Sequence, residues 1–254
     1  MEYENLIKVG RKKSREPTWP IPSDLINGVV ETIMISHKHK SIFIHIPKTA
    51  GSSIEKALLN SNGSFRFFRS DDFDLDRIPP HAFGYQGINQ WDPKHMPTRY
   101  LKTEYNDYFK FCFVRNPWDL MVSCYFWWTQ KVKLPIRIKQ GEILSKIGFD
   151  DFIYSFYTDY INEIHHHGLG QSYWLLDNDN KTVIVDYIGR FEMLQDDFNV
   201  ICDTIGMKRI GLGQVNASKH KKYVSYYNEL TAKMITNKFL VDIQKFNYTM
   251  LNNR

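Results

Sequence analysis

The sequence predicts an α/β protein with a P-loop-like, three-layer fold, in which helices flank a central and mainly parallel sheet. Apolar, β-branched runs are each followed by a short loop and a segment with helical spacing, which is the βα unit of parallel sheets. The 254 residues, 43% of them hydrophobic and 15% aromatic, are enough for a sizeable core and exclude a disordered or fibrous chain. We therefore expect a single domain over residues 1–254, with an N-terminal extension at 1–40 and a core at 41–254.

The first elements surround a short glycine-containing loop. An apolar run at residues 28–35 predicts an edge strand within the N-terminal extension. Residues 41–46 alternate and are β-branched, so they predict a buried strand that breaks at Pro47, and helical spacing begins after Gly51. Residues 60–107 are irregular and contain several prolines, which is typical of a functional or lid-like loop.

The rest of the chain repeats the strand-to-helix pattern. Residues 108–114 predict a second strong strand, and the helix after it has a fitting N-cap in Asn116 and a fitting first residue in Pro117. Further expected elements are a helix at 149–161, a strand at 182–188, a helix at 192–205 that stops at Gly206, and an amphipathic helix from about Asn228 to Phe246.

Charge and cysteine content limit the partners and the compartment. The net charge of +5 is too small for a general nucleic-acid binder, but residues 207–254 hold nine Lys and Arg against two acids, a local charge of +7 that suits a confined anionic ligand. The three cysteines, Cys112, Cys124 and Cys202, form neither a disulfide framework nor a zinc motif. No apolar leader or membrane-spanning window occurs, so we expect a soluble, cytoplasmic protein with no membrane partner.

The strongest local signal is HIPKTAGSS at residues 45–53, between the first strong strand and its helix. Backbone N–H groups at a helix N-terminus, a glycine that allows close approach, a lysine and hydroxyl side chains together form a cradle for an anion. Lys48 precedes Gly51, so the loop departs from a Walker A motif, in which the lysine follows the glycine. The structural alternative is a plain turn in which Lys48 is solvated.

A second candidate anion site begins at Arg115, again where a strand gives way to a helix. An arginine at a strand's carboxyl end, followed by Ser123 in the helix, has the donors to hold a second phosphate. Ligands of open parallel sheets bind outside the carboxyl ends of the strands, so both loops should open on one crevice. The structural alternative is an ion pair of Arg115 with Asp119 across the first helical turn.

The pair IPKTAGSS and FVRNPWDLMVSCY resembles the sulfotransferase superfamily, and most resembles the branch of the Golgi carbohydrate sulfotransferases and their bacterial relatives. IGRFEMLQDDFNVICDTIG and VNASKHKKYVSYYNE also look like family segments, so the resemblance extends from residue 41 to the C-terminus. It implies a sulfotransferase domain that takes 3′-phosphoadenylyl sulfate (PAPS) as donor and a carbohydrate or small-molecule hydroxyl as acceptor. We expect no metal, because the transferred sulfuryl group carries less charge than a phosphoryl group.

The resemblance also implies roles for residues of this chain. Lys48 is the expected catalytic cation at the leaving oxygen, and Arg115 with Ser123 is expected to hold the 3′-phosphate. The expected contacts to the 5′-phosphosulfate are Pro47, Lys48, Thr49, Ala50, Gly51, Ser52 and Ser53. Arg190 in GRFE and Ser218 and Lys219 in the basic segment are further expected nucleotide contacts. Arg190 has a structural alternative in pairing with Glu192 or another acid, and which basic residue of 219–222 contacts phosphate stays open.

An acceptor hydroxyl needs a general base near neutral pH, for which histidine is the natural residue. His95 lies between the two motifs, at a position that resembles the family's base, and His81 is the alternative. His45 enters the phosphate loop and is expected to be structural. The histidine run at 165–167 has no carboxylate or cysteine spaced to complete a metal site, so we predict a solvated loop there.

Two other functions fit part of the pattern. A P-loop kinase of a small molecule would use a similar loop, but the misplaced lysine and the lack of a recognisable acidic partner for Mg²⁺ count against it. A non-catalytic nucleotide- or glycan-binding module would keep the fold and lose the chemistry, but Lys48, Arg115, Ser123 and a candidate base are all retained. The leading prediction is therefore a PAPS-dependent sulfotransferase that works by in-line displacement.

Overall fold

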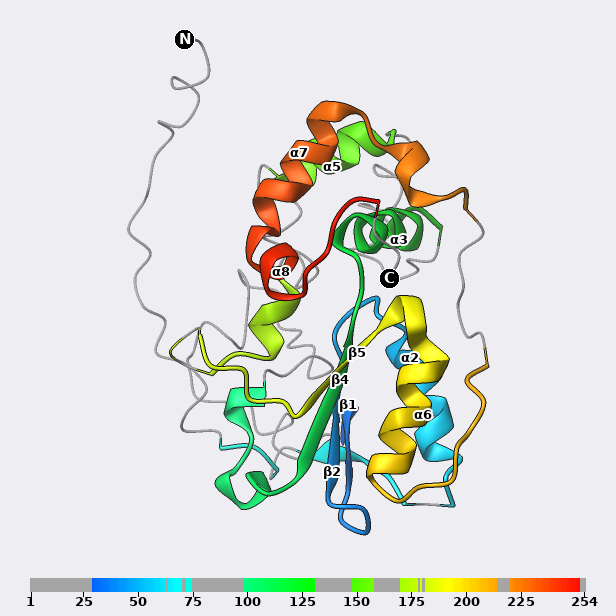
Figure 1. Cartoon of the computed structure of the whole chain (residues 1–254), viewed down its shortest axis with the longest axis vertical. Coiled ribbons are helices and arrows are strands. Elements are labelled where there is room, and N and C mark those ends of the chain that lie inside the picture. The colour runs from blue at the N-terminus through cyan, green and yellow to red at the C-terminus, as the bar shows by residue number, and fades with distance from the viewer. Residues whose placement is uncertain are drawn as a thin grey trace.

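A five-stranded sheet of order β3-β1-β2-β4-β5 forms the centre of the molecule (Figure 1). The computed structural model describes residues 29–62, 64–69, 72–74, 98–130, 148–157, 170–177, 179, 181–213 and 220–251. The strands are β1 (Val29–Ser36), β2 (Ser41–Ile44), β3 (Arg66–Arg69), β4 (Phe109–Val114) and β5 (Tyr187–Arg190). β1 pairs antiparallel with β2 and β3, whereas β2, β4 and β5 pair in parallel, so four of the five strands share one direction. This confirms the predicted α/β fold with a mainly parallel sheet.

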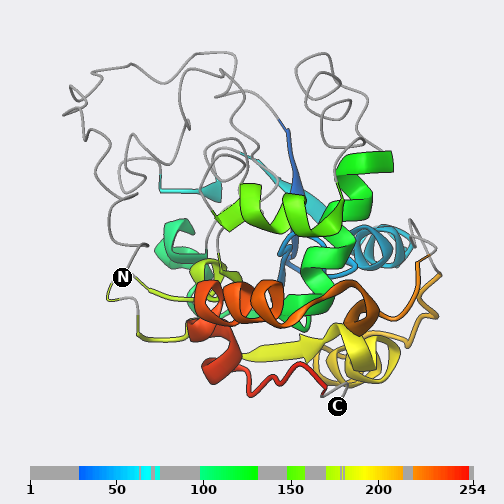
Figure 2. The same ribbon diagram turned by 90° about the horizontal axis from the view of Figure 1, so that it is seen from above.

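Helices cover both faces of this sheet and complete the three layers (Figures 1 and 2). The α-helices are α2 (Gly51–Leu59), α3 (Pro117–Gln130), α5 (Phe149–Tyr157), α6 (Leu194–Thr204), α7 (Glu229–Lys238) and α8 (Leu240–Lys245). Short 3₁₀ helices lie at Thr98–Tyr100, Thr103–Tyr105, Gln171–Trp174, Phe191–Met193 and Tyr223–Tyr226. α2 and α6 pack on one face of the sheet. α3, α5, α7 and α8 lie on the opposite side.

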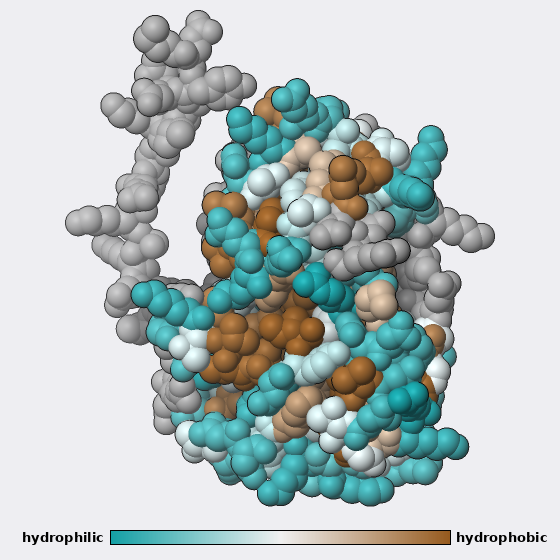
Figure 3. Space-filling model, viewed as in Figure 1, coloured by the Kyte–Doolittle hydropathy of each residue, from teal (hydrophilic) through white to brown (hydrophobic). Residues whose placement is uncertain are grey.

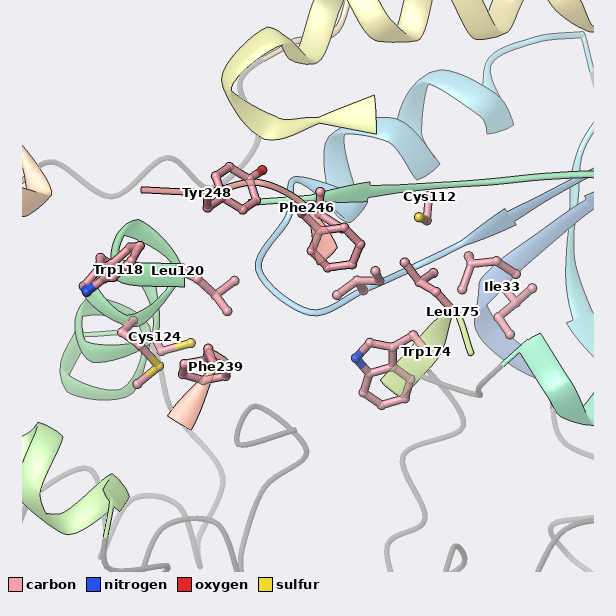
Figure 4. Packing of buried hydrophobic residues seen from close by; sticks show 14 of the residues in the cluster. Ile33, Cys112, Trp118, Leu120, Cys124, Trp174, Leu175, Phe239, Phe246 and Tyr248 are labelled. Atoms are coloured by element: carbon pink, nitrogen blue, oxygen red, sulfur yellow. The ribbon is translucent and has the colours of Figure 1, made fainter. Parts of the chain in front are cut away.

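The alternation of the strands divides the core into two clusters. Phe43 and Phe111 face α2 and α6, and they pack there with apolar side chains such as Phe198. Ile42 and Cys112, their neighbours along the same strands, face the other side and join the larger cluster. That cluster includes Trp118 and Leu120 of α3, Phe239 between α7 and α8, and Phe246 and Tyr248 beyond α8 (Figure 4). Both faces of β2 and β4 are buried, which explains their nearly continuous apolar sequences.

β1 lies inside the sheet, so the prediction of an edge strand in the extension 1–40 is wrong. β3 covers its outer side, and β3 falls in the stretch that the sequence predicts to be irregular. Four residues reading RFFR are too short and too charged for the alternating pattern to reveal a strand. Ile33, Met34 and Ile35 of β1 are fully buried, so the core begins before residue 41.

Two later elements differ from their predicted limits. β5 begins at Tyr187, because the residues before it make only an isolated bridge between Val183 and Leu176. The predicted C-terminal helix is interrupted at Phe239, which ends α7 and precedes α8. The predicted helix at 149–161 is described only as far as α5 extends.

The predicted helix ends are largely as expected. Asn116 caps α3, since its Oδ1 accepts the N–H of Trp118 at 3.1 Å. Gly206 follows α6 with a φ of 67°, the left-handed conformation that glycine adopts without strain. Asn228 caps α7 by accepting the N–H of Thr231 at 2.9 Å.

The surface and the cysteines are unremarkable for a folded domain. The face viewed in Figure 1 is mostly hydrophilic, with several apolar patches, of which the largest lies left of centre (Figure 3). Cys112, Cys124 and Cys202 are buried free thiols. Burial raises the pKa of Cys124 to about 11 and raises that of Cys112 still further, so neither thiol is poised for thiolate chemistry.

Candidate active site

Two connections that follow neighbouring parallel strands meet at the carboxyl edge of the sheet. The loop of residues 45–50, here called the Lys48 loop, joins β2 to α2, and the Arg115–Asn116 turn joins β4 to α3. Nη1 of Arg115 donates a hydrogen bond to the carbonyl of Lys48 at 3.1 Å. The structure thus brings together the two segments that the sequence predicts to bind anions.

The Lys48 loop holds two non-glycine residues in the left-handed backbone region. Lys48 has a φ of 65° and Ala50, the residue before α2, has a φ of 73°. Such a conformation costs on the order of 1–3 kcal/mol per residue and is common in loops that grip ligands. Local hydrogen bonds offset it, because Thr49 Oγ1 donates to the carbonyl of Ile46 at 2.8 Å and the Ser53 N–H donates to the carbonyl of Ala50 at 2.9 Å.

His45 supports this loop, as the sequence predicts. Its Nδ1 lies 2.6 Å from Oε1 of Glu55 in α2, and the two side chains are only 10% and 14% exposed. Its ring also lies against Gly51, where an added Cβ would come within 2.0 Å of Nε2. The glycine at this position is therefore required by the imidazole, a reason different from the close approach to phosphate that its place in the motif suggests.

The side chain of Lys48 is partly buried and reaches towards α3. Its Nζ lies 5.4 Å from the centroid of the Trp127 ring, a distance typical of a cation–π interaction. The alternative of a merely solvated lysine is therefore wrong. The other predicted 5′-phosphosulfate contacts share this connection: Pro47, Thr49 and Ser53 are buried, Ala50 is half-buried, and Ser52 is exposed.

Arg115 makes the predicted structural ion pair and also contacts the Lys48 loop. Its Nε lies 2.8 Å from Oδ2 of Asp119, and its guanidinium carbon lies 3.9 Å from the centroid of the Phe191 ring. Ser123 is buried one helical turn after Asp119 on α3. The positive charges of Lys48 and Arg115 both oppose the burial that raises the pKa of Cys124, so both cations act on this part of α3.

Asn116 has more partners than its predicted role as a helix cap requires. Its backbone N–H donates to Oε1 of Glu192 at 2.7 Å, and its Nδ2 donates to the carbonyl of Thr249 at 2.9 Å. The residue that follows Arg115 is thus tied to segments far away in the sequence. Gln171, Asp242 and Tyr248 belong to the same hydrogen-bond system and were not found from the sequence. An aspartate within the apolar tail segment LVDIQKF is the signal that points to Asp242.

Arg190 faces the C-terminal segment of the structure. Its Nη2 donates to the carbonyl of Phe246 at 2.6 Å, and its guanidinium carbon lies 4.8 Å from the centroid of the Tyr248 ring. Among the described residues no ion pair joins Arg190 to Glu192, whose carboxylate accepts from Asn116 and Tyr248. A nucleotide contact by Arg190 stays a prediction.

Several predicted residues lie outside the described residues: His95, His81, Ser218, Lys219 and the run at 165–167. The structure describes the basic segment from His220 onward. The His220 ring stacks on Phe126 of α3, with ring centroids 5.2 Å apart and planes at 10°. Phe126 precedes Trp127, the residue beside Lys48. The basic segment therefore approaches the candidate site over the second half of α3. Among the described residues, no group of three or more His, Cys, Asp and Glu side chains has the geometry to hold a metal ion.

Comparisons with known proteins identify the family. The model described as "Sulfotransferase family" matches residues 31–249. A carbohydrate sulfotransferase 10 of Xenopus laevis is 22% identical over 87% of this chain and 68% of its own length. The Gallus gallus carbohydrate sulfotransferase 10 is 22% identical over 87% and 67%, and the Danio rerio carbohydrate sulfotransferase 14 is 18% identical over 96% and 69%. No solved structure matches the chain significantly.

The prediction of a cytoplasmic protein is wrong. The relatives are named carbohydrate sulfotransferases, and the branch of this family that the chain resembles is that of the Golgi enzymes. The lack of an apolar leader or span, on which the prediction rests, does not specify a compartment. Within the part of the chain that the structure describes, none of the helices has the length and apolar character needed to span a membrane.

Proposed function

The chain belongs to the sulfotransferase family, and from this premise we propose that it transfers a sulfuryl group from PAPS to a carbohydrate hydroxyl. The acceptor class is suggested by the relatives, which are named carbohydrate sulfotransferases. One observation carries the donor proposal: the hydrogen bond from Arg115 to the carbonyl of Lys48 joins two cationic connections at the carboxyl edge of the sheet. Membership in this family also counts against the P-loop kinase alternative.

The two connections match the two anionic ends of the donor. The Lys48 loop precedes the N-terminus of α2, where backbone N–H groups favour a negative charge, so it suits the 5′-phosphosulfate. Arg115 suits the 3′-phosphate, because a guanidinium has five N–H donors and its bonds to Asp119 and Lys48 use Nε and Nη1. Ser123, buried on the same side of α3 as Asp119, is the second proposed partner of this phosphate.

The proposed reaction is an in-line displacement at sulfur. The acceptor oxygen forms a bond to sulfur while the bond between sulfur and the bridging oxygen of the 5′-phosphate breaks. Negative charge grows on that bridging oxygen, and the Lys48 ammonium stabilises it in the transition state. The leaving group departs as adenosine 3′,5′-bisphosphate.

The proton of the acceptor hydroxyl needs a base, and we assign it to the imidazole of His95, with His81 as the alternative. A histidine with an ordinary pKa near 6.5 is largely neutral at physiological pH and accepts a proton readily. His95→Ala and His81→Ala separate the two assignments: the variant that lacks the base loses transfer without losing nucleotide affinity.

A titration and a transfer assay test the function together. We expect calorimetry to show a preference for adenosine 3′,5′-bisphosphate over adenosine 5′-monophosphate, and no preference for ATP with Mg²⁺. Transfer of label from radiolabelled PAPS to a panel of carbohydrates should persist in EDTA. A preference for ATP with Mg²⁺ would overturn the proposal, and bisphosphate binding without transfer to any acceptor would favour the non-catalytic module.

A further inference from the structure

We propose that the segment at residues 242–250 positions Arg115 for the 3′-phosphate, through two buried hydrogen-bond relays that end on the Arg115–Asn116 turn. Asp242 and Tyr248 are the positioning residues at the far ends of these relays. The proposal rests on the proposed function, since it concerns the same nucleotide site. The segment runs from α8 towards the start of α3 (Figure 1), where the carbonyl of Thr249 accepts a hydrogen bond from Asn116.

The first relay holds the backbone of Arg115 through one side chain. Oε1 of Gln171 accepts the N–H of Arg115 at 2.7 Å, and Nε2 of Gln171 donates to the carbonyl of Arg115 at 2.8 Å. Gln171 is 1% exposed. Because one amide group binds both backbone polar groups of Arg115, it fixes the direction in which the arginine side chain leaves the chain.

Asp242 of α8 holds Gln171 in turn. Its carboxylate accepts the N–H of Gln171 at 2.5 Å and the N–H of Ser172 at 2.9 Å, and it is fully buried. It therefore caps a 3₁₀ helix from another element. Gly170 allows this approach, since an added Cβ there would lie 3.0 Å from Oδ1 of Asp242.

Burial of the Asp242 carboxylate costs desolvation free energy, which indicates that this side chain does more than fill space. Desolvation raises the pKa of Asp242, and the hydrogen bonds from Ser172 and Gln171 oppose that shift. An apolar side chain of similar size would avoid the desolvation but would leave two backbone N–H groups without acceptors. The carboxylate is what allows Gln171 to be held in place.

The second relay holds the next residue, Asn116. Oε1 of Glu192 accepts the N–H of Asn116 at 2.7 Å, and Oε2 accepts the hydroxyl of Tyr248 at 3.1 Å. The side chain of Asn116 also reaches the carbonyl of Thr249. Tyr248 is 4% exposed and packs in the cluster that contains Trp118 of α3 (Figure 4).

Together the relays hold the backbones of two consecutive residues, Arg115 and Asn116. A guanidinium binds phosphate best when its position is set before the ligand arrives, because less rotational freedom is then lost on binding. Partners of this kind, which hold a binding residue without touching the ligand, commonly change affinity by about 10- to 100-fold in metal sites. We expect a loss near the lower end of that range for the 3′-phosphate.

The test uses the whole chain and two variants. Asp242→Asn keeps the size of the side chain but offers one acceptor where two are needed, and Tyr248→Phe removes only a hydroxyl. Tyr105→Phe is the matched control, because its buried hydroxyl also donates to a carboxylate, that of Asp72 at 2.7 Å, outside the relays. Calorimetry compares adenosine 3′,5′-bisphosphate with adenosine 5′-monophosphate, and thermal denaturation follows the fold.

We expect Asp242→Asn and Tyr248→Phe to weaken bisphosphate binding by about tenfold and 5′-monophosphate binding by less than about twofold, whereas Tyr105→Phe changes neither. Combining either variant with Arg115→Ala should add no further loss, because all act through one guanidinium. If Asp242→Asn does not fold, Tyr248→Phe alone decides.

Three results overturn the proposal and are distinguishable from one another. If the wild-type chain shows no preference for the bisphosphate, the donor proposal falls and this one falls with it. If the wild-type preference is present and both variants retain it, the proposed function stands and the positioning role is wrong. If the variants weaken both nucleotides equally, the segment supports the fold in general rather than Arg115.

Discussion

The Lys48 loop and the Arg115–Asn116 turn carry the two proposed anion contacts, but they are held in opposite ways. The loop contains left-handed residues at 48 and 50, and most of its support is local, from His45 with Glu55 and from Thr49 with Ile46, besides the bond from Arg115 to the Lys48 carbonyl. The turn contains no left-handed residue and is held by distant groups, Gln171 on the backbone of Arg115 and Glu192 on that of Asn116. Residues nearby in the sequence therefore determine most of the loop conformation, whereas residues distant in the sequence determine the conformation of the turn.

This difference predicts which substitutions affect chemistry, binding or stability. Changes within the loop should act on the reaction or on the loop's own conformation. Changes to the turn or its supports should act on the 3′-phosphate, because the turn is the point where remote segments converge.

The largest effect is expected from Lys48→Ala. Loss of the cation at the leaving oxygen should lower the rate of sulfuryl transfer by about 10²- to 10³-fold, as removal of one electrostatic donor does in other active sites. The fold should be unaffected, because the loop is held by other side chains. Radiolabelled transfer measures the rate and thermal denaturation measures the stability of the fold. Lys56→Ala, on the exposed side of α2, is the control. A large drop in melting temperature would show that the loop is not self-supporting.

Arg115→Ala should have the second-largest effect. We expect it to lower the affinity for the bisphosphate by about 10- to 100-fold and to leave the affinity for the 5′-monophosphate nearly unchanged. It should also lower the free energy of unfolding by about 3 kcal/mol, because Asp119 loses its partner in a largely buried pair. Asp119→Asn is the matched variant: it removes the competing carboxylate and leaves the guanidinium, so bisphosphate affinity should stay equal or increase. Calorimetry that found both variants equally weak would argue against Arg115 as the phosphate ligand.

Gly51→Ala tests the local support of the loop. The new methyl group would overlap the His45 imidazole, and overpacking of this kind costs about 1–3 kcal/mol. Gly213→Ala is the control, since a Cβ there meets nothing within 4 Å. Urea denaturation measures both. His45→Ala should restore part of the stability in the Gly51→Ala background, and no restoration would show that the imidazole is not the obstacle.

The smallest expected effect is on the pH dependence of the free energy of unfolding, through Asp242, which supports the turn. Desolvation raises the pKa of Asp242, so the folded chain holds this proton more tightly than the unfolded chain. The resulting stabilisation is complete below the unfolded carboxyl pKa of about 4 and is lost as the pH rises through the raised pKa. Asp242→Asn should therefore flatten this fall in the free energy of unfolding.

Asp203 provides a control of opposite sign for that measurement. It is exposed, and its hydrogen bond with Arg209 lowers its pKa, so its contribution is present above the unfolded pKa and is lost as the pH falls. If Asp203→Asn and Asp242→Asn changed the pH profile in the same direction, the assignment of the raised pKa to Asp242 would be wrong.

The same contrast explains what the sequence could predict. Strand end, proline, glycine and helix start fall within a few residues of each other at the Lys48 loop, so its place in a βα unit was predicted. The reason for Gly51 was not, because the His45 ring that requires it is positioned only by the fold.

The supports of the turn could not be predicted in the same way. Gln171 contacts Arg115 across 56 positions and Asp242 contacts Gln171 across 71, so no local pattern links them. β3 was missed for a related reason: its four residues show little alternation, and it is stabilised by pairing with β1. The local motifs pointed to Lys48 and Arg115 and the family resemblance gave their roles, but neither pointed to the side chains that hold them.

The hydrogen bond between Asn116 and Thr249 spans 133 positions and has a consequence for the order of folding. A chain emerging from the ribosome can form β2, the Lys48 loop and α2 long before residues near 250 are available. Contacts of such long sequence separation form late, because closing the intervening chain is entropically costly. The second anion contact should mature only when the domain is complete, so incomplete chains would have little affinity for nucleotide.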